Sequence, residues 1–126
     1  MNKILIIDDD KNIKRMLVRR LKKAGYDIST AENGAKGIEA VYEVFPDIIF
    51  MDMDMPVMDG YQATRTLRNK GWEGLIIALT ASVMSSETGQ AMEAGCDHFF
   101  PKPIGTDFET KLKTVLEAGH ETDSGS

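Results

Sequence analysis

The chain lacks several features that define other classes of protein. It has a single cysteine, Cys96, so no disulfide bond can form within it, and this residue is expected to be a small buried apolar side chain. No apolar run approaches the ~18 residues needed to span a membrane. The first residues lack the apolar core and the cleavage site of a secretory signal peptide. We therefore expect a cytoplasmic protein that makes no contact with a membrane.

An excess of basic residues is also missing. The chain has 20 acidic residues against 15 Lys and Arg, which gives a net charge of −5. This balance argues against nucleic-acid binding by the domain as a whole. The remaining composition, 42% hydrophobic and 28% charged, is ordinary for a globular protein, and 126 residues suit one domain with one core.

Strand-like and helix-like segments alternate five times along the sequence. Short apolar or β-rich runs predict strands at residues 3–7, 27–31, 47–51, 75–79 and 98–100, of which the polar 27–31 suits a sheet edge. Helical periodicity predicts helices at residues 11–24, 34–45, 61–69, 83–94 and 106–118. This order implies an α/β fold, a doubly wound parallel sheet with helices on both faces and right-handed crossovers.

Two local features of these segments carry further expectations. The second helix has an apolar stripe of Ile38, Val41, Tyr42 and Phe45, which we expect to face the core, and Pro46 ends it. Residues 119–126 are Gly, Ser and acidic residues, a composition that predicts a disordered tail or linker stub after a domain of residues 1–118.

Polar side chains follow the strand-like segments at the points where these end. They are Asp8, Asp9 and Asp10 after the first, Asp52 and Asp54 after the third, Thr80 after the fourth and Lys102 after the last. In an open α/β sheet the ligand crevice lies beyond the carboxyl ends of the strands, so these residues can converge on one site. For Asp10 we favour a simpler role, capping the first helix.

A cluster of carboxylates needs a cation. Two carboxylates about 4 Å apart repel each other by roughly 4 kcal/mol at an effective dielectric constant near 20. Mg²⁺ keeps several waters and needs few protein ligands, so two carboxylates and one carbonyl suffice. A hydroxyl and an ammonium group beside the ion suit a phosphoryl group.

Four segments together resemble the receiver domain of two-component response regulators, in the family's order. They are Ile4–Asp9, Asp52–Gly60, Leu79–Thr80–Ala81 and Lys102–Pro103. The resemblance covers residues 3 to about 118 and is chemotaxis-regulator-like, with local similarity to the receivers of hybrid kinases. It implies a flavodoxin-like fold with strand order 2-1-3-4-5 and five helices.

The resemblance also implies a role for each matching residue. Asp52 accepts the phosphoryl group from a histidine kinase or a histidine phosphotransfer protein. Asp9, Asp52 and the backbone carbonyl of Asp54 ligate Mg²⁺, and Asp8 acts mostly through a water. Lys102 pairs with the phosphoryl oxygens.

Switching is implied to involve two further residues. Thr80 donates its hydroxyl to the phosphoryl group, and Phe99 is the switch aromatic, so that the surface of the fourth helix, fifth strand and fifth helix changes. Pro103 is implied to follow a cis peptide bond. The chain is expected to be a phosphoacceptor that assists its own transfer and slow dephosphorylation, and otherwise not an enzyme.

Several matters stay open at the level of sequence. The downstream target is unknown, and either a monomer or a phosphorylation-dependent dimer is compatible with the resemblance. Asp54 and Ser82 occupy positions that vary in the family and affect phosphoryl lifetime. The chain is either a stand-alone regulator or one piece of a longer protein.

Two alternative functions share features with this sequence. A phosphatase resembling the haloacid dehalogenase family also has an Asp-x-Asp after a buried strand, here Asp52-Met53-Asp54, followed by a Thr and a Lys. Its metal-binding acids come after the lysine, however, whereas Asp8 and Asp9 come first. An interaction module that is never phosphorylated typically loses an acid or the lysine, and this chain keeps every one.

Overall fold

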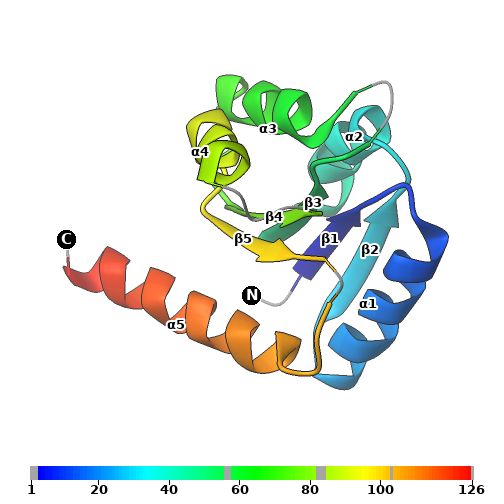
Figure 1. Cartoon of the computed structure of the whole chain (residues 1–126), viewed down its shortest axis with the longest axis vertical. Helices are drawn as coiled ribbons and strands as arrows, with labels where there is room; N and C mark the ends of the chain where they lie inside the picture. The colour runs from blue at the N-terminus through cyan, green and yellow to red at the C-terminus, as the bar shows by residue number, and fades with distance from the viewer. Residues whose placement is uncertain (1–2, 56–57, 82–84, 103, 126) are drawn as a thin grey trace.

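The protein, in a computed structural model, is built around one parallel β-sheet (Figure 1). The structure describes residues 3–55, 58–81, 85–102 and 104–125. The strands are β1 (Lys3–Ile7), β2 (Asp27–Ala31), β3 (Ile48–Asp52), β4 (Leu75–Thr80) and β5 (His98–Pro101). All four strand pairs are parallel and the order is β2-β1-β3-β4-β5, as the sequence resemblance predicted.

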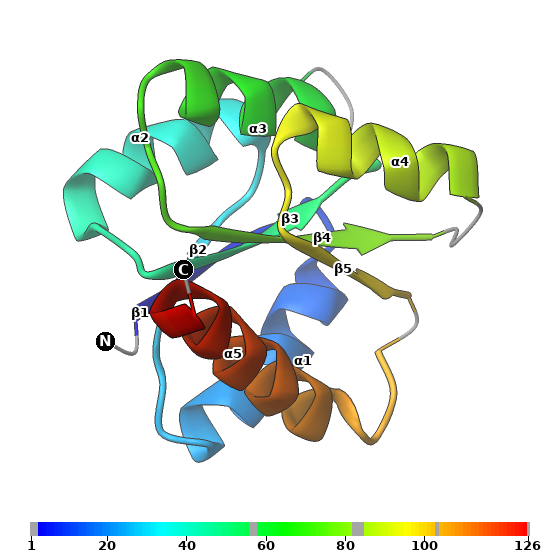
Figure 2. The same ribbon diagram turned by 90° about the vertical axis from the view of Figure 1, so that its left-hand side faces the viewer.

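Five helices cover the two faces of the sheet. They are α1 (Lys11–Lys23), α2 (Gly34–Val44), α3 (Gly60–Asn69), α4 (Ser85–Ala94) and α5 (Phe108–Gly125). Helices α1 and α5 lie on one face, and α2, α3 and α4 lie on the other (Figure 2). This is the doubly wound arrangement expected of alternating strands and helices.

The alternation of side chains along β1 divides the core into two layers. Leu5 and Ile7 pack toward α2 and α3, whereas Ile4 and Ile6 pack toward α1 and α5. The continuous apolar run thus reflects a strand buried on both faces. The polar strand β2 lies at the sheet edge, as predicted.

The end of α2 differs from its predicted form. Val41 is fully buried, but Tyr42 is 45% exposed and Phe45 is 69% exposed, so the expectation of four inward residues was wrong for these two. The helix stops at Val44, and Phe45 takes a left-handed conformation with φ 49° ahead of Pro46. The residue before proline is disfavoured in the helical region, and the change of backbone direction turns the ring away from the core.

Helix α5 is longer than predicted. Its backbone continues to Gly125, through the segment that composition predicted to be disordered, and no proline interrupts it there. The domain boundary at residue 118 stays a prediction. Ser82 and Pro103, with the peptide bond implied to be cis, lie outside the described residues.

The described helices include none that is both long enough and apolar enough to cross a membrane.

Arg68 on α3 fastens the start of β4 and the loop before β5. Its guanidinium donates to the carbonyl oxygens of Gly95, Trp72 and Gly74 at 3.0, 2.9 and 2.8 Å. It also pairs with the carboxylate of Asp97 at 3.0 Å. This planar fork satisfies three backbone carbonyls of two segments at once, and a lysine cannot reproduce its geometry.

We predict that Arg68→Lys lowers the free energy of unfolding by about 2 kcal/mol, because hydrogen bonds to charged groups contribute roughly 1.5–3 kcal/mol each and not all are replaced. Urea unfolding measures the loss. The matched control is Arg65→Lys, an exposed position on the same helix, expected to change stability by less than about 0.5 kcal/mol. Equal stability of the two variants would contradict this role.

Candidate functional site

The register of the sheet brings the two predicted acidic segments together. Ile7 of β1 is paired with Met51 of β3, so Asp8 and Asp52 leave the sheet side by side. The N–H of Asp8 donates to the carbonyl of Ala31 at 3.1 Å, which holds the first of them to the sheet edge. Backbone pairing of the strands therefore brings Asp8 and Asp52 next to each other at one end of the sheet.

Three of the predicted acids form one cluster. Carboxylate oxygens of Asp8, Asp9 and Asp52 lie within 4.8 Å of one another. Asp8 and Asp52 are buried, at 0% and 1% exposure, and Asp9 is exposed at the mouth. Among the residues that the structure describes, this is the one group of three or more such side chains placed to hold a metal ion.

Lys102 reaches the cluster from the end of β5. Its N–H donates to the carbonyl of Thr80 at 2.8 Å, which continues the β4–β5 pairing. Its ammonium group lies 3.0 Å from Asp52 Oδ1 and 3.4 Å from Asp8 Oδ2. Burial by itself lowers the pKa of Lys102, but the hydrogen bond and charge of Asp52, together with Asp8, outweigh burial and raise it. The lysine is therefore held as a cation.

Opposing influences act on the pKa of Asp52, and their net effect is to raise it. Burial and the neighbouring Asp8 raise the pKa of its carboxyl group, while the Asp54 N–H and Lys102 oppose that rise. The Asp54 N–H donates to Asp52 Oδ1 at 3.0 Å. The Asp54 N–H and the Lys102 ammonium both donate to Oδ1, so Asp52 Oδ2 is not the acceptor in either contact.

One buried oxygen of the cluster has no hydrogen-bond partner. Asp8 Oδ1 accepts from the Asp10 N–H at 2.8 Å, but Asp8 Oδ2 accepts no hydrogen bond, and Lys102 approaches it only at 3.4 Å. A buried, unsatisfied carboxylate oxygen is costly unless something occupies the space beside it. Carboxylate oxygens are the ligands that Mg²⁺ takes, and the residues present fit that ion.

The two predicted switch residues lie on neighbouring strands. Thr80, at the end of β4, is buried at 5% exposure, and Phe99 on β5 is 38% exposed. Phe99 is paired with Ala78, two residues before Thr80 on β4. The aromatic ring is thus on the strand next to the hydroxyl, and part of it faces the solvent.

The loops around the site are fixed by capping and close packing. Asp10 accepts hydrogen bonds from the N–H groups of Asn12 and Ile13, so it caps α1 as predicted. Asp59 caps α3 through Gln62. Gly60 packs so closely that an added Cβ would lie 2.4 Å from the carbonyl oxygen of Asp52.

Sequence reasoning missed one contact at the site. Asp54 Oδ2 accepts from the N–H of Ala81 at 3.3 Å, which ties the loop after β3 to the loop after β4. The resemblance implies a role only for the backbone carbonyl of Asp54. No sequence signal could have revealed this contact, because it depends on how two loops approach each other.

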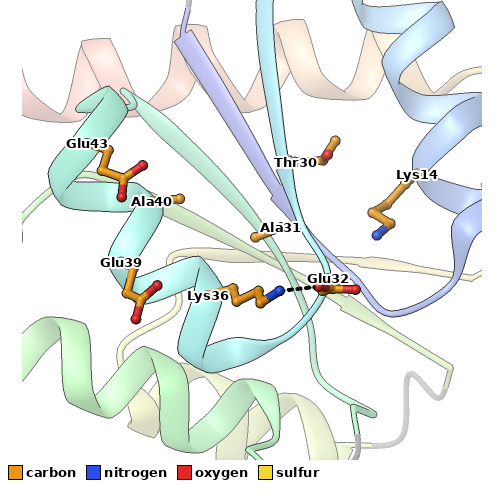
Figure 3. A pocket seen from close by; sticks show the side chains of 8 residues that line it. All are labelled: Lys14, Thr30, Ala31, Glu32, Lys36, Glu39, Ala40 and Glu43. Atoms are coloured by element: carbon orange, nitrogen blue, oxygen red, sulfur yellow. Dashed lines mark hydrogen bonds and ion pairs between the residues drawn. The ribbon is translucent and has the colours of Figure 1, made fainter.

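A groove of about 410 Å³ lies elsewhere, between α1, β2 and α2 (Figure 3). No member of the carboxylate cluster lines it. An ion pair crosses it, from Lys36 Nζ to Glu32 Oε1 at 2.5 Å, and Glu39 and Glu43 face it from α2 (Figure 3). Its charges are largely matched from within, so the groove is not the candidate site.

Comparison with known proteins agrees with this geometry. The family model of the response regulator receiver domain matches residues 4–115. The chain belongs to the response regulator receiver family. Receiver domains are the phosphoacceptors of two-component systems and bind Mg²⁺ at an acidic pocket, for which Asp8, Asp9 and Asp52 form the cluster here. They are signalling domains and not conventional enzymes, and they interact with histidine kinases and downstream effectors.

Individual relatives support the same assignment. Response regulator MprA of Mycobacterium sp. (strain KMS) is 34% identical over 81% of this chain and 44% of its own length. The receiver chain therefore spans less than half of that relative. Chemotaxis protein CheY4 of Vibrio cholerae is 28% identical with a TM-score of 0.84, over 93% of this chain and 98% of that structure.

A further solved structure bears on the chemistry. Response regulator TrrA of Thermotoga maritima, in complex with Mg²⁺ and BeF, is 29% identical with a TM-score of 0.79, over 91% of this chain and 99% of its own. The family match disfavours both the haloacid dehalogenase alternative and the module that is never phosphorylated.

We predict that millimolar Mg²⁺ raises the melting temperature of the receiver, because the ion relieves repulsion among carboxylates that are adjacent only in the folded state. The gain is about 1.4 kcal/mol when Mg²⁺ is at ten times its Kd. Asp9→Asn should remove most of this rise.

The matched control is Asp10→Asn, which removes the same charge one residue away and keeps a good helix cap. Its response to Mg²⁺ should equal that of the wild type. An unchanged melting curve of the wild type on adding Mg²⁺ would count against the metal site.

Proposed function

We propose that Asp52 is the phosphoacceptor of this receiver domain. The observation that carries the proposal is its place: a buried carboxylate with the Lys102 ammonium at 3.0 Å on one oxygen and two further carboxylates within 4.8 Å. An oxygen of Asp52 forms a bond to phosphorus as the bond from phosphorus to the donor's histidine nitrogen breaks. The histidine of a kinase or a phosphotransfer protein is the leaving group.

The residues around Asp52 can neutralise the negative charge of the incoming phosphoryl group. A carboxylate is a weak nucleophile toward an anionic phosphoryl group, so catalysis consists mainly of positioning and charge neutralisation. Lys102 supplies a fixed positive charge, and Thr80 supplies a hydroxyl donor. Asp9, Asp52 and the backbone carbonyl of Asp54 would hold Mg²⁺, with Asp8 acting through a water, and the ion would neutralise phosphoryl charge.

The same groups would support slow hydrolysis of the phosphorylated domain. A water oxygen would bond to phosphorus as the bond from phosphorus to the Asp52 oxygen breaks, which releases inorganic phosphate and restores the carboxylate, while Lys102 and a bound Mg²⁺ would neutralise phosphoryl charge. Asp54, whose carboxylate lies at the mouth on the Ala81 N–H, is one side chain placed to affect that rate. These steps assist the domain's own turnover of phosphate and act on no separate substrate.

The output surface is proposed to comprise α4, β5 and α5. The phosphoryl oxygens draw the Thr80 hydroxyl, and Phe99 on the neighbouring strand moves into the space that is vacated. Phe99 is 38% exposed, so its ring is not fully enclosed by the core. A downstream protein, or a second copy in a phosphorylation-dependent dimer, then meets an altered face.

We predict that acetyl phosphate adds one acid-labile phosphoryl group in the presence of Mg²⁺ and that Asp52→Asn abolishes the addition. Asp54→Asn should still accept the group, because only the backbone at position 54 is required. Intact-mass spectrometry distinguishes these outcomes. If Asp52→Asn kept the full mass increase, another residue would be the phosphoacceptor and the proposal would be wrong.

We predict that Thr80→Ala still accepts the phosphoryl group on Asp52 but shows a weaker conformational response to it. With beryllofluoride as the phosphoryl mimic, amide chemical shifts around Phe99 and along α5 should change less in Thr80→Ala than in the wild type. Thr66→Ala, which removes a hydroxyl from the exterior of α3, is the control. A wild-type shift pattern in Thr80→Ala would refute the coupling between the two residues.

A further inference from the structure

Strand β2 has a neighbouring strand on one side only. It lies at the end of the sheet and pairs with β1, in a register that sets Ile7 opposite Ala31. In a parallel ladder the N–H and C=O groups of one residue point to the same side, and those of the next residue point to the other. Within the described part of the chain, the backbone groups on the far side of β2 therefore have no strand to pair with.

One hydrogen bond identifies these outward backbone groups. The N–H of Asp8 donates to the carbonyl of Ala31 at 3.1 Å, so the backbone groups of Ala31 face β1. Ser29, two residues earlier on the strand, faces β1 in the same way. The N–H and C=O groups of Ile28 and Thr30 consequently point away from the sheet. We call these four backbone groups the open edge.

The open edge lacks the usual protection of a sheet edge. Natural edge strands are commonly short or interrupted by proline or lysine, because unpaired backbone groups attract further strands. At the opposite edge, β5 has only four residues and ends at Pro101. Strand β2 has five residues, as the inner strands β1 and β3 do, and it contains neither proline nor lysine. The sheet is therefore better suited to accept a further strand beside β2 than beside β5.

A groove at this edge leaves room for such a strand. Its volume is about 410 Å³, and Thr30 and Ala31 of β2 line it between Lys14 of α1 and several residues of α2 (Figure 3). Ligand-binding clefts in proteins have volumes of roughly 300–1,000 Å³. Thr30 is exposed, so the two helices do not cover the edge at that point.

The wall of the groove formed by α2 is acidic. Glu39 and Glu43 lie on successive turns of α2 and are exposed (Figure 3). Lys36, on the preceding turn, is paired with Glu32. Among the residues that the structure describes, neither Glu39 nor Glu43 takes part in an ion pair. These two carboxylates are available to the cations of a partner.

The spacing of the two carboxylates matches that of an extended chain. Helix α2 packs against β2, and residues four apart on a helix are separated by about 6 Å along its axis. Alternate residues of a β-strand are separated by about 6.6 Å and point to the same face. A strand laid along the open edge can therefore direct two alternate basic side chains toward Glu39 and Glu43.

We propose that β2 accepts an added β-strand from a partner protein, an extended segment with Lys or Arg at alternate positions. Its backbone pairs with the N–H and C=O groups of Ile28 and Thr30, and its basic side chains contact Glu39 and Glu43. In this mode of recognition the main-chain bonds supply affinity and the side chains supply specificity. The intervening side chains point to the face where Lys14 lies, so small polar residues suit them. The inference does not depend on the role of Asp52.

A second copy of this chain is a poorer occupant of the open edge. Two β2 strands paired about a twofold axis run antiparallel, and both copies of α2 then lie on the same face of the joined sheet. Glu39 and Glu43 would approach the same carboxylates of the other copy, and like charges across an interface are costly. A small cation can neutralise the carboxylates, but it cannot pair with the backbone of alternate β2 residues.

The test uses the full chain and a blocked peptide in which lysine alternates with threonine. Amide hydrogen exchange followed by NMR reports on each backbone N–H. In the free protein, the N–H groups of Ile28 and Thr30 should exchange rapidly and that of Ser29 slowly, because only Ser29 is bonded within the sheet. Peptide at ten times its Kd should slow exchange at Ile28 and Thr30 by about tenfold and change Ser29 little. Unchanged exchange at Ile28 and Thr30 would show that no strand is added.

A double variant tests the acidic wall. Glu39→Gln with Glu43→Gln should weaken peptide binding by about fivefold, since exposed ion pairs contribute modestly. Glu73→Gln with Glu93→Gln, which removes the same charge from exposed positions elsewhere, should leave binding nearly unchanged. The difference should shrink as salt screens the charges. Equal affinities of the two double variants would contradict the preference for a basic segment.

A variant of β2 tests the backbone pairing. Thr30→Pro removes an outward N–H and no bond to β1, so the melting temperature should change little while peptide binding weakens by about fivefold. Thr30→Ala keeps the N–H and should bind as the wild type does. Equal binding by folded Thr30→Pro and Thr30→Ala would contradict pairing at this residue.

A variant of the peptide tests the same point without changing the protein. Proline in place of one central threonine keeps every charge but interrupts backbone pairing, so the protection of Ile28 and Thr30 should be lost. Equal affinity of the two peptides would reduce the interaction to charge attraction and overturn the proposal. Protection of Ile28 and Thr30 that grows with protein concentration in the absence of peptide would also overturn it, by making a second copy the occupant.

Discussion

The burial of two carboxylates side by side is the constraint on which this receiver depends. Asp8 and Asp52 are almost completely withdrawn from water at the ends of β1 and β3, where their charges repel each other. The ammonium of Lys102, brought from the end of β5, lies between them at 3.4 and 3.0 Å and offsets part of that repulsion. The compensation is incomplete, since one oxygen of Asp8 remains without a hydrogen bond. A cation and a phosphoryl group are what such an arrangement attracts.

This constraint links Asp52 to strands β4 and β5. Lys102 comes directly after β5, and its backbone is hydrogen-bonded to Thr80 of β4. Any change in charge at Asp52 therefore acts on residues attached to both strands. Below the site the rings of Phe50, Phe100 and Phe108 pack together between β3, β5 and α5, with centroids 5.5 to 6.4 Å apart. A tightly packed core of this kind resists gradual deformation.

Acidic and basic residues are concentrated at different places in the molecule. The carboxylates of Asp8, Asp9 and Asp52 gather at the carboxyl ends of the strands, whereas α1 carries seven Lys and Arg residues and no Asp or Glu. Like charges four residues apart, such as those of Lys11 and Arg15, disfavour the helix locally. Packing of Leu17 and Leu21 in the core holds α1 in place despite them. Tertiary burial, more than local propensity, therefore stabilises this helix.

The sequence alone determined the order of strands and helices, the residues at the strand ends and the cap at Asp10, because hydrophobic period, capping and turn chemistry are local. The resemblance supplied the strand order and the roles. Only tertiary structure decided that Lys102 reaches both Asp8 and Asp52, that the Asp54 carboxylate binds the Ala81 N–H, and that Tyr42 and Phe45 stay exposed. Periodicity states which residues share a face, but not what covers that face. Contacts between segments fifty residues apart depend on the paths of loops, which no local pattern encodes.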